Sequence, residues 1–155
     1  MDTAIRELGT RLRDLLTGVR LLRQRREDER PAVPSGLVGL LMLLDRRAGG
    51  CHARELAEWG RLDPSTVSRA VAALVAHGLV QRRTDPTDRR ASQLTITPAG
   101  RDALTETDDW YEQVFTRALA GWTPGEVAAL STALDRFTRD LEVALAHHDN
   151  RKDAR

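Results

Sequence analysis

Four side chains that can form hydrogen bonds with DNA bases occur within five positions of this chain. An arginine can donate two parallel hydrogen bonds to guanine, and serine and threonine hydroxyls can bond to several base edges. Small hydroxyl residues also allow a helix to approach those edges closely. This group, which we call the polar set, consists of Ser65, Thr66, Ser68 and Arg69. It suits the reading of a DNA sequence if its members lie on the exposed side of a helix.

The surrounding sequence predicts such a helix. Asp63 suits the N-cap position, and Pro64 suits the first helical position. At 100° per residue the apolar Val67, Val71 and Leu74 share one face, and the polar set lies opposite them or at the edges. The outward side therefore carries small and hydroxylated residues, where most surface helices carry long charged ones. An ordinary alanine-rich surface helix is the alternative interpretation.

A basic hairpin follows this helix. Residues 79–84 and 92–97 resemble two short strands, because Leu94 and Ile96 alternate with threonines. The connection DPTDRRA between them carries arginines at its tip, and a narrow minor groove attracts arginine. A solvated turn with two stray charges is the alternative. A helix and a basic hairpin in this order favour a winged helix-turn-helix, which is a DNA-reading arrangement.

The other expected elements are helices, so the predicted fold class is mainly α with a small β-hairpin wing. Ser35, Thr97 and the Thr123–Glu126 capping box are candidate helix starts. The polar residues 149–155 are expected to be a frayed end of the last helix. Apolar side chains recur every three or four residues in the first and last helices. The predicted helices outside the DNA-reading one are 4–29, 36–47, 53–59, 98–120 and a last one that starts after Thr123.

Charge is distributed unevenly along the 155 residues. Residues 1–49 and 50–101 each carry a net charge of +3, whereas residues 102–155 carry −5. The middle of the chain can therefore face phosphate, while the acidic C-terminal part must face elsewhere. Of the 24 basic residues, 23 are arginine, which suits bidentate contacts with phosphate and guanine. A GC-rich genome is an equally good explanation of that bias.

Composition also argues against several other classes of protein. No apolar run reaches the roughly 18 residues of a membrane span, and the N-terminus does not resemble a signal peptide. We therefore expect a cytoplasmic protein without membrane contact. The lone Cys51 excludes an internal disulfide and a cysteine-based zinc site, and no cofactor is expected. The sequence motifs of common hydrolases, metalloproteases and nucleotide-binding enzymes do not occur, so an enzyme is not expected either.

Two other interpretations stay open at this stage. Cys51 lies at the expected start of the third helix, where a lowered thiol pKa would suit a redox sensor. The neighbouring His52 and the His147–His148 pair offer only weak metal sites. The second alternative is a winged-helix module for DNA architecture or protein interaction, without sequence-specific DNA binding.

Beyond these patterns, the chain resembles the MarR family of bacterial transcription regulators. The resemblance covers nearly the whole chain in element order and residues 36–101 in motif detail. Its motifs are ELA, DPSTVSRAVAALVAHGLVQRR, DRR and LTITPAGR, at residues 55–57, 63–83, 88–90 and 94–101.

The resemblance implies a single-domain homodimer. Residues 36–101 would form the winged helix-turn-helix, and residues 1–30 and 102–148 the dimerisation helices. A dimer of this kind would bind a palindromic double-stranded DNA operator with half-sites about one helical turn apart. The apolar stripes of the terminal helices fit this arrangement, although the sequence also allows them to pack within one subunit.

The resemblance also assigns roles to individual residues. The polar set would contact the major groove, with Arg69 as the candidate for guanine. Arg90 matches the wing-tip arginine that enters the minor groove, and Asp88 would hold the shape of the wing. The candidates for phosphate contacts are Arg82, Arg83 and Arg89.

Many relatives respond to small phenolic or lipophilic ligands, which change the spacing of the two recognition helices. The resemblance therefore implies a repressor that such an effector releases from DNA. Trp59, His77, Trp110 and Tyr111 could border a pocket, although aromatic residues on helices more often belong to the core. No pocket residue is carried over from the family, because these residues vary widely within it.

Overall fold

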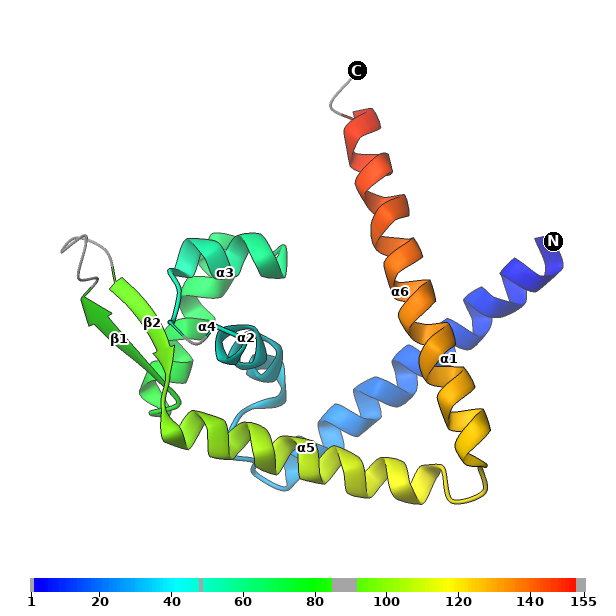
Figure 1. Cartoon of the computed structure of the whole chain (residues 1–155), viewed down its shortest axis with the longest axis horizontal. Coiled ribbons are helices and arrows are strands. Elements are labelled where there is room, and N and C mark those ends of the chain that lie inside the picture. The colour runs from blue at the N-terminus through cyan, green and yellow to red at the C-terminus, as the bar shows by residue number, and fades with distance from the viewer. Residues whose placement is uncertain (1, 48, 85–91, 153–155) are drawn as a thin grey trace. The chain divides into compact units, whose positions relative to one another are not determined.

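The computed structural model describes residues 2–47, 49–84 and 92–152, and the side chains of residues 3–47, 49–84 and 92–145. These residues form six helices and one antiparallel hairpin, which confirms the mainly helical class with a β wing (Figure 1). The elements are α1 (Asp2–Asp28), α2 (Ser35–Asp45), α3 (Ala53–Gly60), α4 (Pro64–Ala76), β1 (Val80–Thr84), β2 (Ser92–Ile96), α5 (Pro98–Ala118) and α6 (Pro124–Lys152).

The chain divides into two compact units, Met1–Trp110 and Tyr111–Arg155, and α5 contributes to both. Helices α1 to α5 occur where the sequence predicts them, with ends that differ by one or two residues. Helix α6 continues to Lys152, into the polar segment that the sequence analysis expects to be frayed. Helical hydrogen bonds are local, so a polar segment can extend an existing helix without an apolar face of its own.

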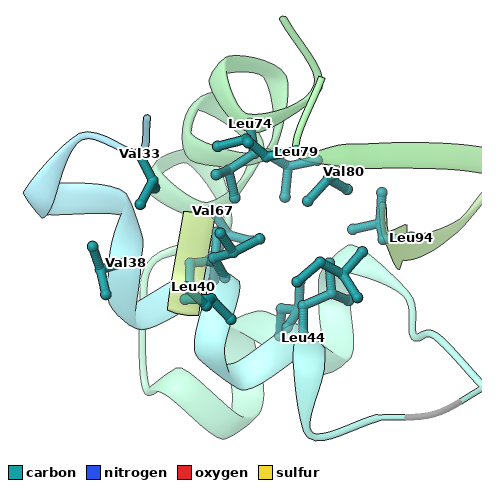
Figure 2. Close-up of a cluster of buried hydrophobic side chains, with 14 of the residues drawn as sticks. Val33, Val38, Leu40, Leu44, Val67, Leu74, Leu79, Val80 and Leu94 are labelled. Carbon is teal, nitrogen blue, oxygen red and sulfur yellow. The ribbon is translucent and has the colours of Figure 1, made fainter. Parts of the chain in front are cut away.

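The first unit has one hydrophobic core, to which α2, α3, α4 and the hairpin all contribute (Figure 2). Helix α4 contributes Val67, Val71 and Leu74, each only 1% exposed. Leu41 and Leu44 of α2 are equally well buried in the same cluster. Burying each side chain of this size contributes roughly 1.5–3 kcal/mol to folding. This core therefore fixes which face of α4 is turned inward and which is left for solvent.

Strands β1 and β2 pair with Val80 opposite Ile96. Cys51 forms an isolated antiparallel β-bridge on the other side of β2. Its N–H donates to the carbonyl oxygen of Leu94 at 3.0 Å, and its carbonyl oxygen accepts from the N–H of Leu94 at 2.8 Å. Cys51, which the sequence places next to the start of the third helix, therefore belongs to this bridge, and His52 is the N-cap residue of α3. The free edge of β2 offers the backbone of Cys51 hydrogen-bond partners. Gly50 permits this turn, with a φ of 78°.

Two of the three predicted helix starts outside α4 are confirmed. Thr97 Oγ1 accepts a hydrogen bond from the N–H of Gly100 at 3.0 Å. Thr123 and Glu126 form the expected reciprocal capping box, with bonds of 2.7 and 3.3 Å. The prediction for Ser35 was wrong, because Ser35 is the first helical residue and makes no capping bond. Its N–H donates instead to the carboxylate of Glu27 in α1, which replaces a local cap.

The end of α1 is attached to α5 within the first unit. Arg26 is only 1% exposed, and its Nη2 donates to Thr107 Oγ1 at 2.6 Å. The guanidinium carbon of Arg26 lies 5.5 Å from the ring centre of Trp110, and Trp110 Nε1 donates to Glu29 at 2.7 Å. These contacts link the dimerisation helix expected from the sequence to the helix that follows the wing.

Large apolar side chains remain exposed on both terminal helices, each considered by itself. On α1, Ile5 and Leu16 are 60% and 67% exposed. On α6, Leu130, Leu134 and Leu141 are 41–45% exposed. In the part of the chain that the structure describes, no helix is long and apolar enough to cross a membrane. These apolar side chains are thus not covered within the described part of the single chain.

Gly100, at the start of α5, occupies a position where a side chain does not fit. An added Cβ would lie 2.3 Å from the carbonyl oxygen of Leu79 and 2.6 Å from Ile96 Cγ1. We expect Gly100→Ala to lower the free energy of unfolding by about 1–3 kcal/mol, because the contact would be overpacked. Urea unfolding at one fixed protein concentration measures this change.

The matched control is Gly39→Ala, on the exposed side of α2, where nothing lies within 4 Å of the added Cβ. This substitution should raise the free energy of unfolding by about 0.5–1 kcal/mol, because alanine favours a helix over glycine. Equal stability of Gly100→Ala and the unchanged protein would contradict the close contact with Leu79.

Candidate nucleic-acid interface

The exposed face of α4 carries the polar set that the sequence singled out. Ser65, Thr66, Ser68 and Arg69 are all exposed, while the apolar stripe of the same helix is buried in the core. The arrangement follows from helical periodicity, since the inward residues recur every three or four positions. The first two turns of α4 therefore present hydroxyl groups and one guanidinium group to solvent. Arg69 Nε lies 3.4 Å from the carbonyl oxygen of Ser65, one turn earlier.

Asp63 holds the N-terminus of α4 in place. Its Oδ1 accepts hydrogen bonds from the N–H of Ser65 at 2.8 Å and the N–H of Thr66 at 3.3 Å, which confirms its N-cap role. The same oxygen accepts the hydroxyl proton of Ser65 at 2.5 Å. These bonds, that of the serine side chain first, hold the pKa of the Asp63 carboxyl below its usual value. The carboxylate is thus ionised at neutral pH.

The hairpin adds two exposed arginines beside α4. Arg82 lies opposite Leu94 in the strand pairing, and Arg83 lies opposite Gln93. Since side chains alternate along a strand, these two arginines point to opposite faces of the hairpin. From the sequence alone, Arg82 and Arg83 were equivalent candidates for a phosphate contact. The expected wing-tip residues Asp88, Arg89 and Arg90 lie outside the described residues.

His52 links the helix-turn-helix to the start of β2, at the end of the hairpin that lies next to the wing tip, a role that sequence reasoning missed. Its ring Nδ1 lies 3.2 Å from the carbonyl oxygen of Ser92 at the start of β2, and its N–H donates to Glu55 at 2.6 Å. The residue thus holds the start of α3 against the hairpin. No group of three or more metal-ligating side chains occurs among the residues that the structure describes.

Cys51 is packed inside the core and is only 3% exposed. Burial, together with the nearby Glu55 carboxylate, raises the pKa of its thiol to about 11. The alternative interpretation, in which a helix N-terminus lowers this pKa, is wrong, because the thiol is buried in the core. A buried thiol that stays protonated at neutral pH does not suit a redox sensor, which needs an accessible thiolate.

A polar pocket of about 300 Å³ lies between α2 and α5 within the first unit. Its lining residues are Met42, Asp45, Arg46, Arg101, Leu104, Thr105 and Asp108. Arg101 Nε lies 3.4 Å from Asp45 Oδ1, so the pocket contains an ion pair. The four aromatic and histidine residues considered from the sequence are not among this lining. No sequence signal could locate the pocket, because its two walls are separated by more than fifty residues.

This arrangement of helices, hairpin and exposed polar face defines a winged helix-turn-helix protein. A sequence profile of the MarR family matches residues 38–91. YxaD of Bacillus subtilis (strain 168), described as an uncharacterized HTH-type transcriptional regulator, is 36% identical over 100 residues, which cover 64% of this chain and 69% of that protein. The chain belongs to the MarR family of transcriptional regulators.

Solved structures agree with this assignment at the level of the fold. A MarR family protein from Bacillus stearothermophilus superposes with a TM-score of 0.76 at 19% identity, over 92% of this chain and 98% of that chain. BpsR of Bordetella bronchiseptica has a TM-score of 0.53 at 27% identity, over 68% of this chain and 75% of that chain. The BpsR structure concerns the regulation of its DNA binding by 6-hydroxynicotinic acid.

Burial of Cys51 predicts a slow reaction with thiol reagents. At pH 7.5 we expect a disulfide reagent such as dithionitrobenzoate to modify the folded protein at least about 100-fold more slowly than the urea-unfolded chain, because a rise of two pKa units lowers the thiolate fraction that much. Stopped-flow absorbance measures both rates. Equal rates in the folded and unfolded protein would restore the redox-sensor interpretation.

Proposed function

We propose that this chain is a homodimeric repressor that binds a palindromic DNA operator sequence-specifically and is released by a small ligand. Membership of a family of transcriptional regulators supports the general role. The observation that carries the specific proposal is the exposed polar face of α4. It presents small hydroxylated side chains and a single arginine, Arg69, where an ordinary surface helix carries many long charged side chains. Such a face can enter the major groove and read base edges.

The hairpin supplies the second DNA contact in this proposal. Arg83 is on the face of β1 that is turned away from the core side, so it is the better candidate for a phosphate. Arg82 shares its face with Val80 and Leu94, and is the weaker candidate. Arg90, with Arg89 beside it, would reach the minor groove at the wing tip, while Asp88 would maintain the shape of the tip.

The dimer would form through the terminal helices, residues 1–30 and 102–148. Exposed apolar stripes on α1 and on α6 support this, since each leaves large side chains in solvent in a single chain. Along α6, a surface hollow lined by Ala128, Ala129 and Ala133 would let a helix of the second copy approach closely. A symmetric dimer places two α4 helices on one face, and so requires a palindromic operator.

The ligand would occupy the pocket between α2 and α5. The volume of about 300 Å³ suits a single-ring molecule. Met42 and Leu104 could contact its ring, and Arg46 and Arg101 could bind an anionic group in competition with Asp45. A small aromatic acid, such as the 6-hydroxynicotinic acid that regulates BpsR, has this chemistry. Such a ligand would lie between α2 and α5 and change the distance between them. That movement would in turn change the spacing of the two recognition helices in the dimer.

Operator binding is the first property to test. We expect fluorescence anisotropy to show binding of a duplex selected by the protein from a random pool at least about 1,000-fold tighter than binding of a scrambled duplex. The affinity should fall steeply with salt, because arginines displace counterions from phosphates. Addition of 6-hydroxynicotinic acid should then weaken the complex. Weak and equal binding of both duplexes would replace the proposal with an architectural module.

The apolar stripe of α6 predicts a charge-sensitive dimer. Leu134→Asp should convert the dimer to a monomer, since an aspartate would be buried in the interface without a partner. Ser131→Asp, one helical turn before Leu134 and at the exposed edge of the stripe, adds the same charge where solvent can reach it and should weaken the dimer much less. Light scattering at matched concentrations distinguishes the two states. A dimeric Leu134→Asp protein would refute this interface.

A further inference from the structure

The hydroxyl group of Ser65 donates its proton to a hydrogen bond within the protein. Ser65 Oγ lies 2.5 Å from Asp63 Oδ1. A carboxylate has no proton to give, so the serine is the donor in this bond. The N–H groups of Ser65 and Thr66 donate to the same oxygen, and together these bonds hold the pKa of Asp63 low. The direction of the serine bond is therefore fixed at neutral pH.

This direction decides what Ser65 can offer to DNA. A hydroxyl group has one proton and two lone pairs, so only lone pairs remain for an outside partner. Phosphate oxygens are acceptors, and so are O6 and N7 of guanine and O4 of thymine. None of these can bond to Ser65 while Asp63 holds its proton. The donors in the major groove are the exocyclic amino groups, N6 of adenine and N4 of cytosine.

We propose that Ser65 determines specificity by accepting a hydrogen bond from the exocyclic amino group of an adenine or a cytosine in each half-site. This inference rests on the proposed function, because it requires α4 to lie in the major groove. Asp63 acts as a positioning residue, since it sets the direction of the Ser65 bond and contacts no base. Arg69, one helical turn later, presents only donors and suits a guanine.

The test compares base preferences of the dimeric protein with those of Ser65→Ala, by selection from a random duplex pool followed by sequencing. The unchanged protein should prefer adenine or cytosine at one position of each half-site. Ser65→Ala should reduce that preference by about five- to tenfold, the effect of one neutral hydrogen bond. Its affinity for a scrambled duplex and its salt dependence should stay unchanged, because no phosphate contact is lost.

Two conservative variants serve as controls. Asp63→Asn keeps an oxygen that accepts the Ser65 proton and removes the charge, so the base preference should persist. Ser65→Thr keeps the hydroxyl group, so it should restore the preference that Ser65→Ala loses. Circular dichroism and light scattering confirm that all the variants remain folded and dimeric.

A base analogue identifies the group that is recognised. A duplex with purine in place of the preferred adenine, or 2-pyrimidinone in place of the preferred cytosine, lacks only the amino group. It should bind the unchanged protein about five- to tenfold more weakly than the parent duplex, and Ser65→Ala should bind both duplexes alike. A Ser65→Ala protein that loses affinity for all sequences equally would overturn the inference and leave the operator function intact. A flat base profile for the unchanged protein would overturn both.

Discussion

Burial of the apolar stripe of α4 is the constraint on which the DNA-reading part depends. Val67, Val71 and Leu74 fit into a core shared by α2, α3 and the hairpin, so α4 cannot rotate about its axis without exposing them. The cost of exposing three such side chains is several kcal/mol, which is comparable with the whole stability of a small domain. The orientation of the polar set therefore follows from packing on the opposite side of the helix.

The same core also determines where the wing lies. Leu79 and Val80 enter the core directly after α4, and Leu94 and Ile96 return to it from β2. Close contact of Gly100 with Leu79 fixes the start of α5 against this hairpin. Cys51 bonds to the free edge of β2 and connects the third helix to the sheet. Helix α4 and the hairpin are thus parts of one packed unit, as their proposed placement in neighbouring grooves would require.

On the terminal helices α1 and α6, unlike on α4, large apolar side chains are not buried within the single chain. Their apolar side chains are exposed in a single chain, so these helices would gain from burial only in the proposed dimer. In such a dimer, stability and DNA binding would both depend on protein concentration. Arg26 of α1 donates a hydrogen bond to Thr107 of α5. Through this contact, the proposed ligand next to α5 would affect the dimer as well as DNA binding.

Local patterns in the sequence were sufficient to predict the helices, the hairpin and the exposed polar face of α4. Caps such as Asp63 and Thr97, and stripes repeated every three or four residues, depend on neighbours within one turn. Contacts between distant segments were not readable in this way. The replacement of the Ser35 cap by Glu27, the bridge of Cys51 to Leu94 and the pocket between α2 and α5 each join residues that only packing brings together. The raised pKa of Cys51 has the same origin, because burial is a property of the assembled core and not of the adjacent residues.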